Sequence, residues 1–219
     1  MNLQVDTDHY FNADYDSKER FISYWHQINE IITLTPSSIF EIGIGSGLVA
    51  TYLKQRGYNV TTMDIDKSLN PDQVGSVLSI PFYDDAFEVI SCFQVLEHLP
   101  FEDLSVALSE IYRVSRDYAV LSLPDFTRAY RLDIQIPKIG ELKRLIPLPR
   151  LKSLKHVFDG KHYWEIGKPG YPLRKVMGEM RSVGFEIKKT YRVFEIPFHR
   201  FFVLAKHEVV NVRRKARQQ

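Results

Sequence analysis

The chain has 219 residues, of which 44% are hydrophobic and 26% charged, and its formal net charge is +2. This composition is typical of a globular protein, and the length fits one domain over residues 1–219, since domains of about 100–200 residues are usual. The single cysteine, Cys92, excludes an internal disulfide framework and a cysteine-rich zinc site. Because neither a signal-peptide pattern nor a run of about 18 apolar residues is present, we expect a soluble, cytoplasmic protein.

Local patterns predict alternating helices and strands. Apolar residues at three- and four-residue spacing, or short runs rich in Ile, Val and Phe, give the assignments. They are helices at 17–34, 48–57, 101–115 and 172–184, and strands at 37–44, 58–65, 74–80, 86–95, 117–124, 185–196 and 199–207. The last two strands are too close in sequence for a crossover and should pair antiparallel. We therefore predict an α/β fold, a three-layer Rossmann-like sandwich whose seven-stranded sheet is mostly parallel, with one antiparallel strand near the edge.

The same patterns divide the chain into parts. An N-terminal helix or cap (1–36) precedes the core (37–123), and a terminal helix and strand pair (171–207) precedes a basic tail (208–219). Between them, residues 124–170 contain five prolines and fit no regular pattern. A long irregular insertion in a compact domain is usually functional, so we expect a lid or an acceptor loop there.

A glycine-rich loop lies between the first core strand and the helix that follows it. Glu41 precedes three glycines at 43, 45 and 47, and Asp64 comes after the second strand. Such a loop lets the backbone approach a ligand and directs N–H groups of the helix start at an anion. An acid after the second strand can accept the hydroxyls of a ribose. Asp66, two residues on, could share that role.

The segments FEIGIGSGLVATYLKQRGYNVTTMDID and SIPFYDDAFEVISCFQVLEHLP resemble the class I S-adenosylmethionine (SAM) dependent methyltransferases, in the group with small-molecule acceptors. The resemblance covers roughly residues 37–123 and, less distinctly, the last helix and strands. It implies SAM as cofactor, S-adenosylhomocysteine as product, and a methyl-transfer site beside the Leu-Glu-His segment. The cofactor-binding residues that it implies are Glu41, Gly43, Gly45, Gly47, Asp64, Ile65, Ser76, Val77, Gln94 and Tyr15. Glu41 could instead only fix the loop, and Tyr15 could be a core contact rather than part of a cap over the cofactor.

The sequence departs from the family pattern at several positions. The link between strands two and three is short, so its helix should be absent or a single turn. Ser76 stands where an acid usually meets the adenine. Some relatives bind a divalent metal through Glu-x-x-Glu-His, but Gln94 replaces the first acid here, and we expect no metal.

Two histidines are candidate catalytic residues. Methyl transfer is an in-line displacement that needs alignment and sometimes a base. His98 follows the fourth strand on the ligand side of the sheet, and His162 lies in the aromatic and polar part of the insertion. Either could be a base or acceptor ligand, and either could be a structural histidine with a backbone partner.

The insertion is also the most basic part of the chain. Residues 128–155 contain eight basic and two acidic residues (net +6), whereas residues 1–35 contain two basic and six acidic ones (net −4). Apolar residues lie between the cations of 138–155, which favours an anionic lipid or membrane surface, a charged acceptor, or a helix pair coated with Lys and Arg. A nucleic acid partner is disfavoured, because aromatic residues do not alternate with the cations.

We therefore predict a SAM-dependent methyltransferase that acts on a small, anionic, lipid- or sugar-linked acceptor. The alternatives are a SAM-binding regulator without turnover, a surface binder of membranes or nucleic acid on the same fold, and a nicotinamide-dependent oxidoreductase. The last is disfavoured by Leu48, where a dinucleotide loop requires a small residue.

Overall fold

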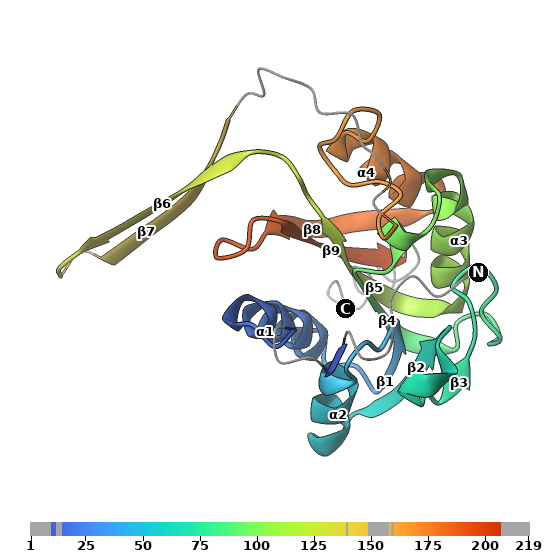
Figure 1. Cartoon of the computed structure of the whole chain (residues 1–219). Coiled ribbons are helices and arrows are strands. Elements are labelled where there is room, and N and C mark those ends of the chain that lie inside the picture. Colours follow the sequence, from blue (N-terminus) through green and yellow to red (C-terminus); the bar gives the residue numbers. More distant parts are fainter. Residues whose placement is uncertain (1–9, 12–14, 139, 149–157, 159, 207–219) are drawn as a thin grey trace, which may run out of the picture.

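The computed structural model describes residues 10–11, 15–138, 140–148, 158 and 160–206. Its centre is a seven-stranded sheet in the order β3-β2-β1-β4-β5-β9-β8 (Figure 1). The strands are β1 (Ser38–Ile42), β2 (Asn59–Asp64), β3 (Gln73–Val74), β4 (Phe87–Phe93), β5 (Ser115–Pro124), β8 (Phe185–Arg192) and β9 (His199–Lys206). Only β9 runs against its neighbours β5 and β8, and the other adjacent strands pair in parallel. The predicted sheet, with one antiparallel strand beside the edge, is confirmed.

Helices cover both faces of this sheet (Figure 1). One layer holds α1 (Lys18–Thr33) and α2 (Leu48–Gln55), and the other holds α3 (Leu104–Val114) and α4 (Leu173–Ser182). Neighbouring residues of β1 point to opposite layers, because side chains alternate along a strand. Ile39 belongs to the cluster that contains Leu53 of α2, and Phe40 to the cluster that contains Ile111 of α3. The three-layer sandwich is therefore confirmed. None of the helices in the described part of the chain is long and apolar enough to cross a bilayer.

The link from β2 to β3 is short, as predicted, and the chain after β3 is less regular than expected. The place of the missing helix is taken by a single 3-10 turn, Lys67–Leu69. The predicted strand at 74–80 is largely wrong, since β3 ends at Val74. The chain then turns back on itself, with a bridge between Ser76 and Ser79, and the N–H of Ile80 donates to the Glu110 carboxylate (2.7 Å) rather than to a strand.

The insertion contains a long β-hairpin, so the prediction of an irregular segment was wrong there. Strand β6 (Ala129–Ile136) pairs antiparallel with β7 (Gly140–Pro147) in a separate two-stranded sheet. Figure 1 shows this ribbon extending away from the body of the domain. For residues 140–147, which lie in the described part of the stretch 138–155, the same register rules out the helix pair considered from the sequence. Residues 149–157, with three of the predicted basic residues, and the tail 208–219 lie outside the described residues.

Candidate active site

A pocket lies where the first, second and fourth strands of the core end and α1 begins. Its walls come from the segments that follow β1, β2 and β4 and from aromatic and polar residues near α1. Of the residues predicted from the sequence, nine line it: Tyr15, Glu41, Gly43, Gly45, Asp64, Ile65, Val77, Gln94 and His98. Gly47, Ser76 and His162 are not among its lining residues. Gly47 is the N-cap of α2, and the Ser76 hydroxyl accepts the N–H of Leu78 (3.2 Å).

The glycine loop is set by a close approach of two segments at its first glycine. Gly43 has φ +79°, and its N–H donates to the carbonyl of Met63 on β2 (2.8 Å). A Cβ at this position would lie 2.3 Å from Cγ2 of Val95, far inside van der Waals contact. Only glycine therefore fits here without displacing Val95, which itself lines the pocket.

Asp64, the last residue of β2, joins the second strand to the glycine loop. Its Oδ2 accepts the N–H of Ile44 (2.9 Å) and its Oδ1 accepts the N–H of Asp66 (2.9 Å). Burial raises the pKa of Asp64, against the effect of these backbone donors. A carboxylate has about four acceptor positions, so with these donors and the N–H of Ile65 at least one stays available to a ligand. Asp66 instead accepts from the backbone and hydroxyl of Ser68, and so caps the 3-10 turn.

Glu41 contributes a buried carboxyl group to the same pocket. The residue is 3% exposed, and Oε2 has no hydrogen-bond partner in the described structure. Burial raises the pKa of Glu41 to about 8, with only a small opposing effect from Lys54. An unpartnered carboxyl oxygen at the wall of a pocket favours a ligand with a donor or a positive charge there.

The other wall of the pocket comes from the N-terminal segment and α1. The rings of Tyr10 and Tyr15 meet edge to face (centroids 5.4 Å apart), and the Arg20 guanidinium lies 4.2 Å from the Tyr15 ring centroid. On α1, the Tyr24 hydroxyl bonds with that of Ser46 in the glycine loop (3.1 Å). Sequence analysis anticipated Tyr15 but missed the lining residues Arg20, Tyr24 and Gln27. Their spacing of four and three residues places them on one helix face, a signal that could have identified them.

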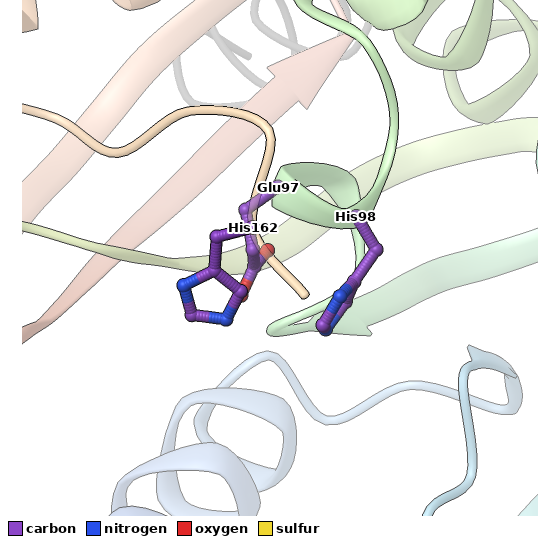
Figure 2. Close-up of side chains that lie close together, drawn as sticks. All are labelled: Glu97, His98 and His162. Carbon is purple, nitrogen blue, oxygen red and sulfur yellow. The ribbon is translucent and has the colours of Figure 1, made fainter. Parts of the chain in front are cut away.

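The two candidate histidines lie side by side at the end of β4 (Figure 2). His98 ends the 3-10 turn Leu96–His98, and the ring of His162 reaches it from the insertion, with centroids 5.1 Å apart. His98 Nδ1 bonds with the carbonyl of Lys161 (2.9 Å), and His162 Nδ1 bonds with Glu165 Oε1 (2.9 Å). His98 also lines the pocket, whereas His162 is not among the lining residues and contacts the His98 ring.

Glu97 lies between these histidines and is completely buried (Figure 2). Its Oε2 has no hydrogen-bond partner in the described structure. Burial raises the pKa of Glu97 to about 7, although nearby His162 acts to lower it. The Gln94 amide lies 3.2 Å from Glu97 Oε1 and can donate to it when its nitrogen faces that oxygen. The structure thus brings together a carboxylate and two imidazoles from segments far apart in the sequence.

Comparisons with known proteins agree with this arrangement. Residues 40–123 match a family model described as a methyltransferase domain. A curated relative, an uncharacterized methyltransferase from Staphylococcus carnosus, is 28% identical over 123 residues, which cover 52% of this chain and 58% of that protein. The chain therefore aligns with little more than half of the length of this relative.

Solved structures of methyltransferases share the fold. A SAM-dependent methyltransferase from Clostridium acetobutylicum has a TM-score of 0.61 and 6% identity, with 92% of this chain and 99% of that chain covered. The 1,6-didemethyltoxoflavin-N1-methyltransferase of Burkholderia thailandensis, solved with 1,6-didemethyltoxoflavin and S-adenosylhomocysteine bound, has a TM-score of 0.57 and 12% identity, with 91% and 84% covered. At these identities the likeness concerns the fold.

Proposed function

We propose that this chain, which carries a class I SAM-dependent methyltransferase domain, transfers the SAM methyl group to a small anionic acceptor linked to a lipid or a sugar. The cofactor part rests on the match of residues 40–123 and on the pocket after β1, β2 and β4. The acceptor part rests on one observation, the amphipathic hairpin β6–β7. The cytoplasmic location stays a prediction from the sequence.

The pocket residues suit SAM. When bound, SAM supplies a methyl group already activated by a sulfonium. The buried, unpartnered oxygen of Glu41 suits the positive charges of the cofactor. The remaining acceptor capacity of Asp64 suits the hydroxyls of its ribose. The helix start after Gly47 suits its carboxylate, since backbone N–H groups at a helix N-terminus attract anions. We assign these three roles accordingly.

His98 is the polar side chain that we place next to the acceptor. It lines the cofactor pocket at the end of β4, on the ligand side of a parallel sheet. An imidazole at this position can hold a nucleophilic oxygen or nitrogen and accept its proton. His162 contacts the His98 ring and keeps it in place from the insertion.

The hairpin supports an amphiphilic acceptor because its two faces differ. Cross-strand partners share a face, and Tyr130 pairs with Ile146 and Ile134 with Leu142. These side chains are 40–64% exposed, so this face, which also carries Arg144 opposite Leu132, is a largely apolar surface in water. The opposite face carries charged and polar residues, among them Arg131, Asp133, Gln135, Glu141 and Lys143. An exposed apolar strip bordered by cations is the pattern of a segment that lies in a membrane interface.

Charge adds to the apolar face. Residues 128–148 contain five basic and two acidic side chains, an excess of three positive charges. Each basic residue near an anionic bilayer contributes about 1 kcal/mol, so the excess supplies about 3 kcal/mol at low salt. This attraction holds the hairpin at a surface reversibly and leaves the pocket free to receive a lipid-linked acceptor.

The cofactor assignment is tested by calorimetry with SAM and S-adenosylhomocysteine, using NAD and NADP as controls. We expect the SAM pair to bind and the nucleotide pair not to bind. Binding of NAD alone would overturn the proposal. SAM binding without methyl transfer to any cellular fraction would instead identify a regulator without turnover.

The acceptor assignment is tested with labelled SAM and a cellular lipid extract. We expect label in the extractable lipid fraction and co-sedimentation of the protein with vesicles of phosphatidylcholine and phosphatidylglycerol. The double variant Lys143→Glu, Arg144→Glu should reduce both the label in the lipid fraction and the co-sedimentation with vesicles. The double variant Ile134→Ser, Ile146→Ser should reduce the same two quantities. Glu102→Gln, a surface change far in sequence from the hairpin, is the matched control. Methylation that is unaffected by both hairpin variants would contradict the proposed acceptor.

A further inference from the structure

Three potential metal ligands meet beside the cofactor pocket. One donor atom from each of Glu97, His98 and His162 lies within 4.8 Å of the others (Figure 2). The first two come from the turn after β4 and the third from the insertion. A backbone hydrogen bond from Tyr163 N–H to the Glu97 carbonyl (2.9 Å) holds the two segments together. The cluster is therefore a built feature of the fold and not a chance meeting of surface side chains.

The hydrogen bonds of the two histidines set their tautomers. A carbonyl oxygen only accepts, so His98 Nδ1 carries a proton that it donates to Lys161. Glu165 pairs with Lys168 (2.5 Å) through one carboxylate oxygen, and its other oxygen accepts from His162 Nδ1 (2.9 Å). In the neutral rings, Nε2 then carries the lone pair that a metal requires. Metal-binding histidines are usually oriented in this way by a carbonyl or a carboxylate.

Glu97 supplies the independent observation that a ligand is expected here. Its side chain is completely buried, yet Oε2 has no hydrogen-bond partner in the described structure. A buried carboxylate oxygen without a partner is costly, and a bound cation would compensate it directly. The carboxylate lies between the two imidazole rings (Figure 2), and one of its oxygens is within 4.8 Å of a nitrogen of each ring.

We propose that Glu97, His98 and His162 bind a divalent transition-metal cation, with Zn²⁺ the best match. Two imidazole nitrogens and one carboxylate oxygen form a ligand set that suits Zn²⁺ or its neighbours and not Mg²⁺ or Ca²⁺, which prefer oxygen. Zinc–ligand distances of about 2.0–2.2 Å place tetrahedral ligand atoms about 3.4 Å apart. The donors lie within 4.8 Å of one another, so they need to approach by up to about 1.4 Å to reach that spacing.

The sequence argued against a metal, because Gln94 occupies the position of the first acid in the metal-binding pattern of some relatives. The third donor comes instead from His162, 64 residues after His98. With three protein ligands, a tetrahedral ion keeps one open position. Because His98 also lines the pocket, a group bound at that position would lie next to the cofactor site.

The test is a titration of the chelator-treated full chain with Co²⁺, a spectroscopic substitute for Zn²⁺, followed by competition with Zn²⁺ for a chromophoric chelator. We expect one tight site per chain, with the visible absorption of a four-coordinate Co²⁺ complex. Glu97→Gln, His98→Gln and His162→Gln should each weaken binding at least about 100-fold, and Glu165→Gln, a positioning change, about 10- to 100-fold. His26→Gln is the matched control and should leave affinity unchanged, because His26 lies on α1 and its ring bonds with Tyr191 of β8.

Several results would overturn the proposal: an absent absorption band, a band that persists in all three ligand variants, or an equal loss in His26→Gln. Circular dichroism confirms that each variant is folded. If the buried Glu97 variant does not fold, His162→Gln alone decides, because its side chain is 21% exposed. The site does not depend on methyl transfer. SAM calorimetry on His162→Gln separates the metal proposal from the SAM proposal: this variant should lose metal binding and keep SAM binding, since His162 does not line the cofactor pocket.

Discussion

Gly43→Ala tests the close contact between the glycine loop and the segment after β4. Alanine at φ +79° costs about 1–2 kcal/mol, the penalty of a left-handed conformation for an L-residue. Its Cβ would also lie 2.3 Å from Val95 Cγ2, where ordinary contacts are about 3.5–4.0 Å. Overpacking of this kind costs about 1–3 kcal/mol. We therefore expect a loss of about 2–5 kcal/mol of unfolding free energy, together with weaker SAM binding because Val95 is pushed into the pocket.

Gly47→Ala is the matched control for the backbone penalty. Gly47 has φ +73° in the same loop, but a Cβ there would meet no described atom within 4 Å. The Gly47→Ala variant should lose only the cost of the left-handed conformation, about 1–2 kcal/mol of unfolding free energy. The double variant Gly43→Ala, Val95→Ala should recover the steric part, giving a coupling energy of about 1–3 kcal/mol in urea unfolding. Equal losses for the two glycine variants, or no recovery in the double variant, would refute the argument.

The remaining predictions concern the pocket and the hairpin. Asp64→Ala should weaken SAM binding about 100-fold in calorimetry, since hydrogen bonds to a charged group contribute about 1.5–3 kcal/mol; Asp72→Ala, which loses bonds to Thr62 and Lys54 outside the pocket, should bind normally. Burial raises the pKa of Glu41 to about 8 from its usual 4.5, so the folded state holds a proton that the unfolded state releases. As the pH rises from 4.5 to 8, the unfolding free energy should fall by on the order of 1 kcal/mol per pH unit. If the same slope persists in Glu41→Gln, Glu41 is not its cause. Replacing residues 130–146 by Asn-Gly should abolish vesicle binding while SAM affinity is kept, and reduced SAM affinity would show that the hairpin supports the pocket.

The parts of the fold that follow local patterns were predictable. The period of apolar residues located the helices, and the strand–glycine–helix order placed Glu41, Gly43 and Asp64 around one pocket. These residues are close in the sequence to the turns that position them. The hairpin had a signal too, because Tyr130, Leu132, Ile134 and Ile136 alternate with polar residues. The five prolines and the high charge of the insertion obscured this period of two.

The contacts that the sequence could not predict join distant segments. Nothing near His162 indicates that it meets His98, because their approach depends on the path of the whole insertion. The exposure of Trp25 (59%) on α1 is similar: its spacing is that of a buried face, but the sheet covers only part of that face. Periodicity identifies which residues could be buried, and tertiary packing decides which of them are.

The insertion contains both the hairpin and His162, and backbone hydrogen bonds join its two ends. At the end of β5, the N–H of Phe126 donates to the Ile166 carbonyl (2.7 Å), and the N–H of Ile166 donates to the carbonyl of Pro124 (3.0 Å). The two ends of the insertion therefore meet at the carboxyl edge of the sheet. Asp125, 1% exposed, stabilises this junction through an ion pair with Arg200 (2.7 Å) on β9. The hairpin and His162 are thus parts of one segment whose two ends meet at this edge, and in the proposed function this arrangement would bring an acceptor bound by the hairpin toward the histidine cluster.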